Sequence, residues 1–229
     1  MPVINGQGYS GITPDKQHGL KSYLSLHFII VKNIYKKYPW HVHKYYYMDV
    51  TCGSGINPET KENGSPIIFR NSIGILDHQY EAHFIDRESA NIEYLKKYIP
   101  KDRHMKLHVG DNTEIVPRIV DNIPNKKWTY GLLYMDNNGK PDFELISGVS
   151  RKLPRVDILI RCPCTAIKRC KHIDFKRLTD YIDMAEKNIW LIRQPVEKDP
   201  WQWTFLFGTN YTRMTDWKKE RFYRIDSEE

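Results

Sequence analysis

The sequence alternates short β-rich segments with segments of helical period, and few folds accommodate that alternation. The β-rich segments occupy residues 45–50, 81–85, 106–109, 128–135 and 156–160. Amphipathic segments at 89–98 and 113–121 follow the second and third of them. Strands joined through helices pair in parallel, because a parallel connection must cross back over the sheet. The sequence therefore predicts an α/β fold with a mostly parallel sheet and helices on both faces.

The C-terminal part departs from this alternation. An amphipathic segment at 175–187 precedes two extended runs, 189–194 and 201–209. The runs are joined through Pro195 and Pro200, which leaves no room for a helix. Two strands without a crossover helix pair antiparallel, so we expect an antiparallel strand pair after the parallel strands.

Signals at helix ends mark two helices around the first β-rich segment. Residues 21–37 show apolar positions at helical spacing, lysines near the end and Pro39 beyond it. Ser65 followed by Pro66 predicts an N-cap and a first helical position, so that a second helix begins there.

The composition is sufficient for a sizeable core. Of the 229 residues, 40% are hydrophobic, and no apolar run is long enough for a membrane helix. We expect one domain over residues 1–229, with a loose arm at 1–16 and a charged tail at 217–229. The N-terminus does not resemble a signal peptide, and three of the four cysteines crowd into 162–170. A disulfide scaffold is therefore not expected. We expect a location in the reducing cytoplasm and no association with a membrane.

An acidic residue and two glycines follow the first β-rich segment. The run reads Asp49-Val50-Thr51-Cys52-Gly53-Ser54-Gly55. Glycines at alternate positions let the backbone turn sharply and approach a ligand closely, because no Cβ stands in the way. An acid before such a turn can hold a ligand's ammonium group or brace the glycine loop.

Polar and acidic residues also end the next three β-rich segments. Asp86 ends the second, Asp111 and Asn112 follow the third, and Asp136 and Asn137 follow the fourth. Any one of them alone is a common helix cap or turn former. In an open α/β sheet, however, ligands bind outside the carboxyl ends of the strands. The run of acids at successive strand ends therefore predicts a binding site at that edge.

A nicotinamide dinucleotide site also uses a glycine motif and an acid after the second strand, but this sequence departs from its pattern. That fingerprint needs Gly-x-Gly-x-x-Gly opening directly into a helix. Here Pro58 takes the place of the third glycine, and a polar insertion over 57–63 delays the helix. No helix N-terminus is then offered to a pyrophosphate. A Walker-type phosphate loop is absent too, because no Gly-x-x-x-x-Gly-Lys occurs.

The Asp49-x-x-x-Gly53-x-Gly55 motif, the acids at strand ends and the final extended pair together resemble class I S-adenosylmethionine (AdoMet) methyltransferases. The resemblance implies a Rossmann-like, mostly parallel seven-stranded sheet with an antiparallel C-terminal strand pair. It also implies AdoMet as the cofactor, with Asp86 on the ribose hydroxyls and Asp111 near the adenine amine. The cofactor-binding residues would be Asp49, Gly53, Gly55, Asp86, Asp111 and Asn112.

Over residues 16–210 the sequence also resembles the three-Cys-motif partner proteins, a bacterial group with a methyltransferase-like domain. The likeness rests on the lysine-rich helix before the first strand and on the glycine motif. It rests further on Gly64-Ser65-Pro66 and Phe207-Gly208-Thr209-Asn210. It implies the same AdoMet contacts.

Asp136 and Asn137 are the candidate catalytic residues. Enzymes that methylate an exocyclic base amine carry Asp/Asn/Ser-Pro-Pro-aromatic after the fourth strand, where acceptors bind the amine and a ring stacks on the flipped base. Here the segment reads Asp136-Asn137-Asn138-Gly139-Lys140-Pro141. The acceptors are present and the Pro-Pro-aromatic element is missing. Trp201, Trp203 and Tyr211 are candidates for the ring.

Cys162-Pro163-Cys164-Thr165, after the fifth strand, allows three interpretations. Cys164-Thr165 is faintly similar to the nucleophile segment of RNA cytosine-5 methyltransferases, but the partner Pro-Cys after the fourth strand is absent. A zinc site would use four residues in an unfamiliar spacing, Cys162, Cys164, Cys170 and His172. The interpretation we favour is that these are inert thiols in a basic loop.

Nucleic acid is the expected macromolecular partner. The net charge of +7 suits a polyanion, because cations that neutralise phosphates release counterions. Basic residues gather after the fifth strand, and indole rings that can stack on bases follow in the last extended run. The predicted nucleic-acid contacts are Arg161, Lys168, Arg169, Lys171, Trp201 and Trp203.

Three functions fit these features. The first is AdoMet-dependent methylation of a nucleic acid, either DNA or RNA. The second is a methyltransferase-fold binding or partner protein without catalysis, which the missing Pro-Pro-aromatic element favours. The third is methylation of a protein or small molecule. A protein partner and the oligomeric state are left open.

Overall fold

The computed structural model describes residues 3–4, 7–8, 13–41, 44–57, 61–99, 102–137, 141–163, 178–193, 196–198, 201–212 and 222–225. Within the chain there are two compact units, Met1–Ile115 and Val116–Glu229, called here the first and the second unit. No helix within the described ranges is long and apolar enough to cross a membrane.

Three parallel strands organise the first unit. They are β3 (Tyr45–Asp49), β4 (Tyr80–Asp86) and β5 (Met105–Val109), with β4 in the middle. Tyr45 lies opposite Tyr80, and Ala82 lies opposite Met105, so the three carboxyl ends share one edge. The other elements are β1 (Val3–Ile4), β2 (Gln7–Gly8), α1 (Thr13–Lys37), η1 (Pro39–His41), α2 (Ser65–Ser72), η2 (Ile73–Ile75) and α3 (Ser89–Leu95).

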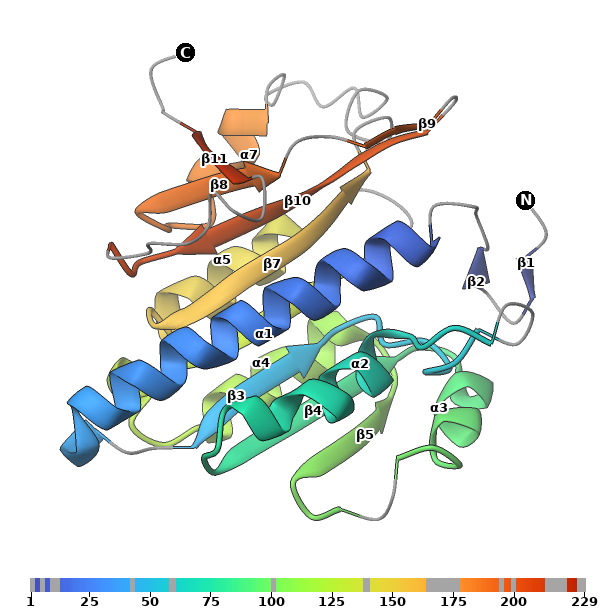
Figure 1. Ribbon diagram of the computed structural model, residues 1–229, viewed down its shortest axis with the longest axis horizontal. Helices are drawn as coiled ribbons and strands as arrows, with labels where there is room; N and C mark the ends of the chain where they lie inside the picture. The colour runs from blue at the N-terminus through green and yellow to red at the C-terminus, as the bar shows by residue number, and fades with distance from the viewer. Residues whose placement is uncertain are drawn as a thin grey trace. The chain divides into compact units, whose positions relative to one another are not determined.

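Aromatic residues pack α1 and α2 against this sheet, on the side that faces the viewer in Figure 1. Every residue of β3 is buried, as expected for a strand covered on both faces. Phe28 of α1 meets Tyr45 and Phe69 edge-on, with ring centroids 5.6 and 5.8 Å apart. Phe69 of α2 stacks on Tyr47 at 4.1 Å. Aromatic pairs of this kind each contribute about 0.5–1.5 kcal/mol beyond area burial, so they fix the base of the turn that follows β3.

The second unit continues with a parallel pair and then antiparallel strands. Its parallel strands are β6 (Gly131–Met135) and β7 (Val156–Pro163). β10 (Trp201–Thr209) runs antiparallel to both β7 and β8 (Ile189–Arg193). β9 (Val196–Lys198) pairs with β10, and β11 (Phe222–Ile225) pairs with β8. The helices are α4 (Asn112–Asn122), which begins in the first unit, η3 (Lys126–Trp128), α5 (Phe143–Lys152) and α7 (Leu178–Asp183).

The fold class predicted from the sequence is confirmed: it is α/β and Rossmann-like, mostly parallel with an antiparallel C-terminal strand pair. The structure adds the short strands β9 and β11 to the seven expected in the sheet, and β1 and β2 form a separate pair in the segment expected as a loose arm. β11 lies in the segment expected only as a charged tail, and its Phe222 is 3% exposed. That buried ring gives the segment an apolar anchor. A single domain over residues 1–229 stays a prediction.

Several element boundaries differ from the expectation. α1 begins at Thr13, earlier than predicted, and β6 begins only at Gly131 because a 3-10 turn precedes it. β7 continues to Pro163 because β10 pairs with it from Ile158 to Pro163. α5 was not predicted, although it has a clear N-cap: Asp142 accepts a hydrogen bond from the Leu145 N–H at 2.9 Å.

The predicted N-cap of α2 is wrong by one residue. Gly64 is the N-cap, and Ser65 is already helical and makes no capping hydrogen bond. The Gly64 N–H donates to the Gly55 carbonyl at 2.7 Å, and the Gly64 carbonyl accepts from Ile67 and Ile68. This bond to the glycine turn, rather than a side-chain cap, sets where the helix begins.

Candidate functional site

The turn after β3 has the sharp backbone that its glycines predict. Gly53 and Gly55 have φ of 63° and 78°, in the left-handed region that L side chains rarely adopt. Asp49, at the end of β3, is fully buried, and its Oδ1 accepts the Thr51 N–H at 3.3 Å. The acid thus braces the start of the turn from inside the protein.

Two contacts close the turn after Gly55. Leu95 of α3 lies against it, so that a Cβ added to Gly55 would stand 2.3 Å from Leu95 Cδ1. The polar insertion after the turn folds back through a bridge between Ile56 and Asn63. The insertion therefore returns the chain to the turn before α2 begins.

Asp86, at the end of β4, holds the glycine turn directly. Its Oδ2 accepts the Gly53 N–H at 2.8 Å. Its Oδ1 accepts the Glu88 N–H at 2.8 Å and the Asn91 Nδ2 at 3.1 Å. Because each carboxylate oxygen has about two acceptor positions, Oδ2 can accept one further bond. The sequence analysis did not identify Asn91. The one sequence feature that could have done so is its position in the first turn of the helix after Asp86.

Asp111 and Asn112 lie between the end of β5 and the first turn of α4. Asp111 Oδ1 accepts from the hydroxyl and the N–H of Thr113, at 2.7 and 2.9 Å, and Oδ2 pairs with Arg87 at 2.8 Å. The Thr113 bonds first, and then Arg87, hold the pKa of Asp111 below its ordinary value. Asn112 Nδ2 donates to the Val50 carbonyl at 3.2 Å, which ties this strand end to the glycine turn.

The structure therefore brings the predicted cofactor residues together at one edge of the first unit. They are Asp49, Gly53, Gly55, Asp86, Asp111 and Asn112. Three carboxylates at one edge favour a neutral or cationic ligand and disfavour a pyrophosphate, because like charges repel. The roles of these residues in binding stay predictions.

The predicted catalytic residues belong to the second unit, at the end of β6. The Asp136 Oδ1 lies 3.5 Å from Arg161 Nη1, and the two side chains are only 20% and 11% exposed. Its Oδ2 accepts the hydroxyl of Tyr134 at 3.4 Å. The Oδ1 of Asn137 is buried and makes no hydrogen bond to the described residues. Sequence reasoning missed Tyr134 and predicted a phosphate contact for Arg161.

The predicted nucleic-acid residues are placed in part. Trp203 is 1% exposed and packs edge-on against Phe205, at 5.4 Å between centroids. A ring so deeply buried is not available for stacking on a base. Arg161 is largely buried beside Asp136, as above. Lys168, Arg169 and Lys171 lie outside the described residues, as does the side chain of Trp201.

Two of the four cysteines, Cys52 and Cys162, are described, and both side chains are buried. Burial, followed by the nearby carboxylates of Asp49 and Asp86, raises the pKa of the Cys52 thiol well above its ordinary value. Cys52 is therefore a poor nucleophile. Among the described residues no group of side chains could hold a metal ion. The zinc hypothesis concerns Cys162, which is described, and Cys164, Cys170 and His172, which lie outside the described residues, so it stays a prediction.

Known proteins resemble this chain in structure only. No family model matches it, and no curated protein does. Human methyltransferase-like protein 13, solved in complex with SAH, has a TM-score of 0.54 at 11% identity, covering 87% of this chain and 84% of its own. A Legionella pneumophila protein has a TM-score of 0.52 at 14% identity, covering 83% of this chain and 86% of its own. Likenesses this distant support the methyltransferase fold alone.

Proposed function

We propose that the protein is an AdoMet-dependent methyltransferase that modifies a nucleic acid. The observation that carries the proposal is the bond from the Gly53 N–H to Asp86, which fixes a glycine turn beside an acidic strand end. A protein of similar fold, human methyltransferase-like protein 13, was solved with SAH. AdoMet has no phosphate and carries an ammonium and a sulfonium group, which suits an edge that gathers Asp49, Asp86 and Asp111.

The first unit would hold the cofactor. When bound, AdoMet supplies an electrophilic methyl group. The remaining acceptor position of Asp86 Oδ2 suits a ribose hydroxyl, and Gly53 and Gly55 let the ligand approach the backbone closely. Asp111 and Asn112 would lie toward the adenine. Asp49 supplies negative charge for the ammonium group.

The second unit would hold the acceptor group. The Arg161 ion pair and the Tyr134 hydroxyl orient the Asp136 carboxylate. With a guanidinium beside it, Asp136 suits the role of a hydrogen-bond acceptor that positions a nucleophile. Asn137 Oδ1 can accept a second hydrogen from the same group, since it makes no bond to the described residues.

Cofactor binding is tested by calorimetry. We expect AdoMet to bind and NAD not to bind. Asp86→Ala should weaken AdoMet binding roughly tenfold or more, because a charge-assisted bond and the support of the turn are lost. Asp102→Ala is the control: Asp102 likewise accepts bonds within the first unit, from the Tyr80 hydroxyl and the His104 N–H, but at the amino-terminal ends of the strands. It should lose stability and keep its AdoMet affinity. Tight NAD binding without AdoMet binding would overturn the proposal.

Catalysis is tested with tritiated AdoMet and total RNA, DNA or protein. We expect label in nucleic acid, and a loss of about 10²–10⁴-fold in turnover for Asp136→Ala at nearly unchanged AdoMet affinity. Asp142→Ala removes an N-cap in the same unit. It should cost about 1 kcal/mol of stability and leave turnover per folded molecule intact. A stable, fully active Asp136→Ala protein contradicts the catalytic role.

A binding or partner protein without catalysis is the second candidate. The missing Pro-Pro-aromatic element after β6 favours it, as does the ion pair that already occupies one oxygen of Asp136. This candidate predicts AdoMet binding without methyl transfer to any acceptor. Membership of the three-Cys-motif partner family is part of the same proposal and stays a prediction.

A further inference from the structure

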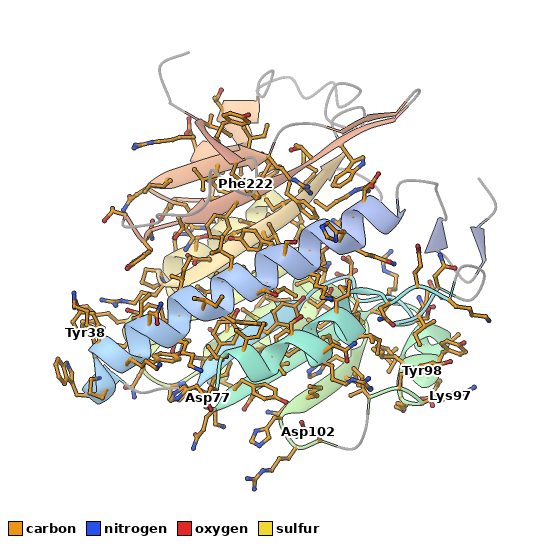
Figure 2. All side chains as sticks on the ribbon, in the orientation of Figure 1. Tyr38, Asp77, Lys97, Tyr98, Asp102 and Phe222 are labelled. Carbon is orange, nitrogen blue, oxygen red and sulfur yellow. The ribbon has the colours of Figure 1, made fainter. Side chains whose placement is uncertain are left out.

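A pocket of about 540 Å³ opens at the opposite edge of the first unit from the glycine turn. Its lining residues are Lys44, His78, Gln79, Tyr80, Glu81, Arg103 and His104. Lys44 precedes β3, Tyr80 begins β4, and His104 precedes β5, so the pocket lies at the amino-terminal ends of the strands. β4 has 7 residues between this edge and Asp86. At ~3.3 Å per residue this separates the pocket from the cofactor edge by about 20 Å. In Figure 2, Asp102 marks this end of the sheet, away from Lys97 and Tyr98 after α3.

The acids around the pocket are already bonded within the protein. Glu81 pairs with Lys44 at 3.2 Å and with Lys106 at 2.6 Å. Asp102 accepts the Tyr80 hydroxyl at 3.0 Å and the His104 N–H at 2.8 Å. The exposed Arg103 donates from Nε to the His104 ring, and its Nη atoms make no hydrogen bond to the described residues. Two lysines share the single carboxylate of Glu81, so their positive charge is only partly compensated. An anion entering the pocket therefore meets this excess charge at Lys44 and the guanidinium fork of Arg103, the donor geometry that suits a phosphate.

Rings stand beside these cations. Tyr80 and His104 have ring centroids 5.5 Å apart, and His78 packs on Tyr35 of α1 at 4.3 Å. The Nε2 of His78 is buried and makes no hydrogen bond to the described residues. Phosphate-binding cations next to aromatic faces are the combination that binds nucleotides of a single strand.

Further exposed rings follow the end of α1. Trp40 is 72% exposed and Tyr38 is 36% exposed, with their ring centroids 6.0 Å apart. Lys37 Nζ lies 5.4 Å from the centroid of Tyr38. Four chain steps separate Trp40 from Lys44, so their Cα atoms lie at most about 14 Å apart. An oligonucleotide seated in the pocket is long enough to reach this ring with another of its bases.

We propose that this pocket binds one nucleotide of a single-stranded nucleic acid, with its phosphate on Lys44 and Arg103 and its base beside Tyr80 and His104. The site lies apart from the cofactor edge and needs no AdoMet. The inference therefore goes beyond methyl transfer and can fail or succeed without it.

The test measures binding of labelled oligouridylate by fluorescence anisotropy and of uridine monophosphate by calorimetry, both without AdoMet. We expect the double variant Lys44→Gln, Arg103→Gln to weaken both ligands by about tenfold or more, as lost bonds to a charged group do. The control double variant Lys21→Gln, Lys97→Gln removes the same charge elsewhere on the first unit and should change affinity by less than about threefold. Trp40→Ala should weaken the oligonucleotide and leave the monophosphate unchanged.

Two results would overturn the inference. The first is unchanged oligonucleotide affinity in a folded Lys44→Gln, Arg103→Gln protein, as judged by circular dichroism. The second is that the monophosphate binds while Trp40→Ala leaves the affinity for the oligonucleotide unchanged. The pocket would then be a site for free nucleotides. AdoMet titrations of the same double variant separate this outcome from the proposed function, because the cofactor affinity should stay at the wild-type value.

Discussion

At the scale of single residues, Gly55 is constrained by backbone and by packing at once. Its φ is 78°, and a Cβ there would stand 2.3 Å from Leu95 Cδ1. Either constraint alone tolerates adjustment, since Leu95 can change rotamer and an L residue can occupy the left-handed region at a cost of about 1 kcal/mol. Together they make the turn intolerant of a side chain.

Gly55→Ala should therefore lower the free energy of unfolding by roughly 2–4 kcal/mol, the sum of left-handed strain and overpacking. Gly74→Ala is the matched control, because Gly74 has no positive φ and no heavy atom within 4 Å of an added Cβ. We expect it to be neutral or slightly stabilising. Urea unfolding of both variants measures the difference. Equal stabilities would show that the turn relaxes freely.

At the scale of elements, β4 and β5 are joined by a histidine pair, in which His83 is buried and His108 is half-buried, as well as by their backbone ladder. His83 Nδ1 lies 3.0 Å from His108 Nε2, and His83 Nε2 lies 3.2 Å from Glu81 Oε1. Burial, then the His108 and Lys106 charges, lowers the pKa of His83 to about 4, although Glu81 opposes this. Burial first, and then Lys106, also lowers the pKa of His108.

Stability should accordingly fall as the pH drops. The unfolded chain takes up a proton at His83 near pH ~6.5, while the folded chain resists it down to about pH 4, so protons favour unfolding across that window. The free energy of unfolding should fall by about 3 kcal/mol in full by pH ~4. The melting temperature should fall clearly less steeply between pH 7 and pH 5 for His83→Gln than for the wild type. The control His18→Gln, on the exposed face of α1, should keep the wild-type slope. Identical slopes in all three proteins contradict this prediction.

At the scale of the whole molecule, the excess of basic residues is the property most relevant to a polyanionic partner. The net charge is +7, and the cofactor edge of the first unit is acidic. The positive excess must therefore lie on other surfaces. The segment that sequence reasoning favours runs from Arg161 to Lys171, and its basic residues Lys168, Arg169 and Lys171 lie outside the described residues.

Neutralising Lys168, Arg169 and Lys171 to Gln should weaken nucleic-acid binding and flatten its salt dependence. Each phosphate contact contributes about 0.7–0.9 to the slope of log affinity against log salt. The triple variant should therefore lose about two units of slope. The control Lys21→Gln, Lys96→Gln, Lys97→Gln removes equal charge from exposed positions of the first unit and should keep the slope. An unchanged slope in the first variant would place the binding surface elsewhere.

The sequence by itself determined the features that arise from local chemistry. Hydrophobic periodicity separated strands from helices, which is why the α/β class and the antiparallel C-terminal pair were predicted. The two glycines at alternate positions predicted a sharp turn, and both Gly53 and Gly55 have positive φ. Acids after successive strands marked the edge where a ligand could bind, because parallel strands bring their carboxyl ends together.

Only the tertiary structure decided which partners these residues meet. Asp86 holds the turn at Gly53, which lies 33 residues away in the chain, and Arg161 turns to Asp136 instead of to solvent. The same holds for Trp203, whose ring is buried against Phe205, and for the pocket at the amino-terminal ends of the strands. Periodicity gives the face on which a side chain lies, but strand order and register choose its neighbour, and these are set by packing of the whole sheet.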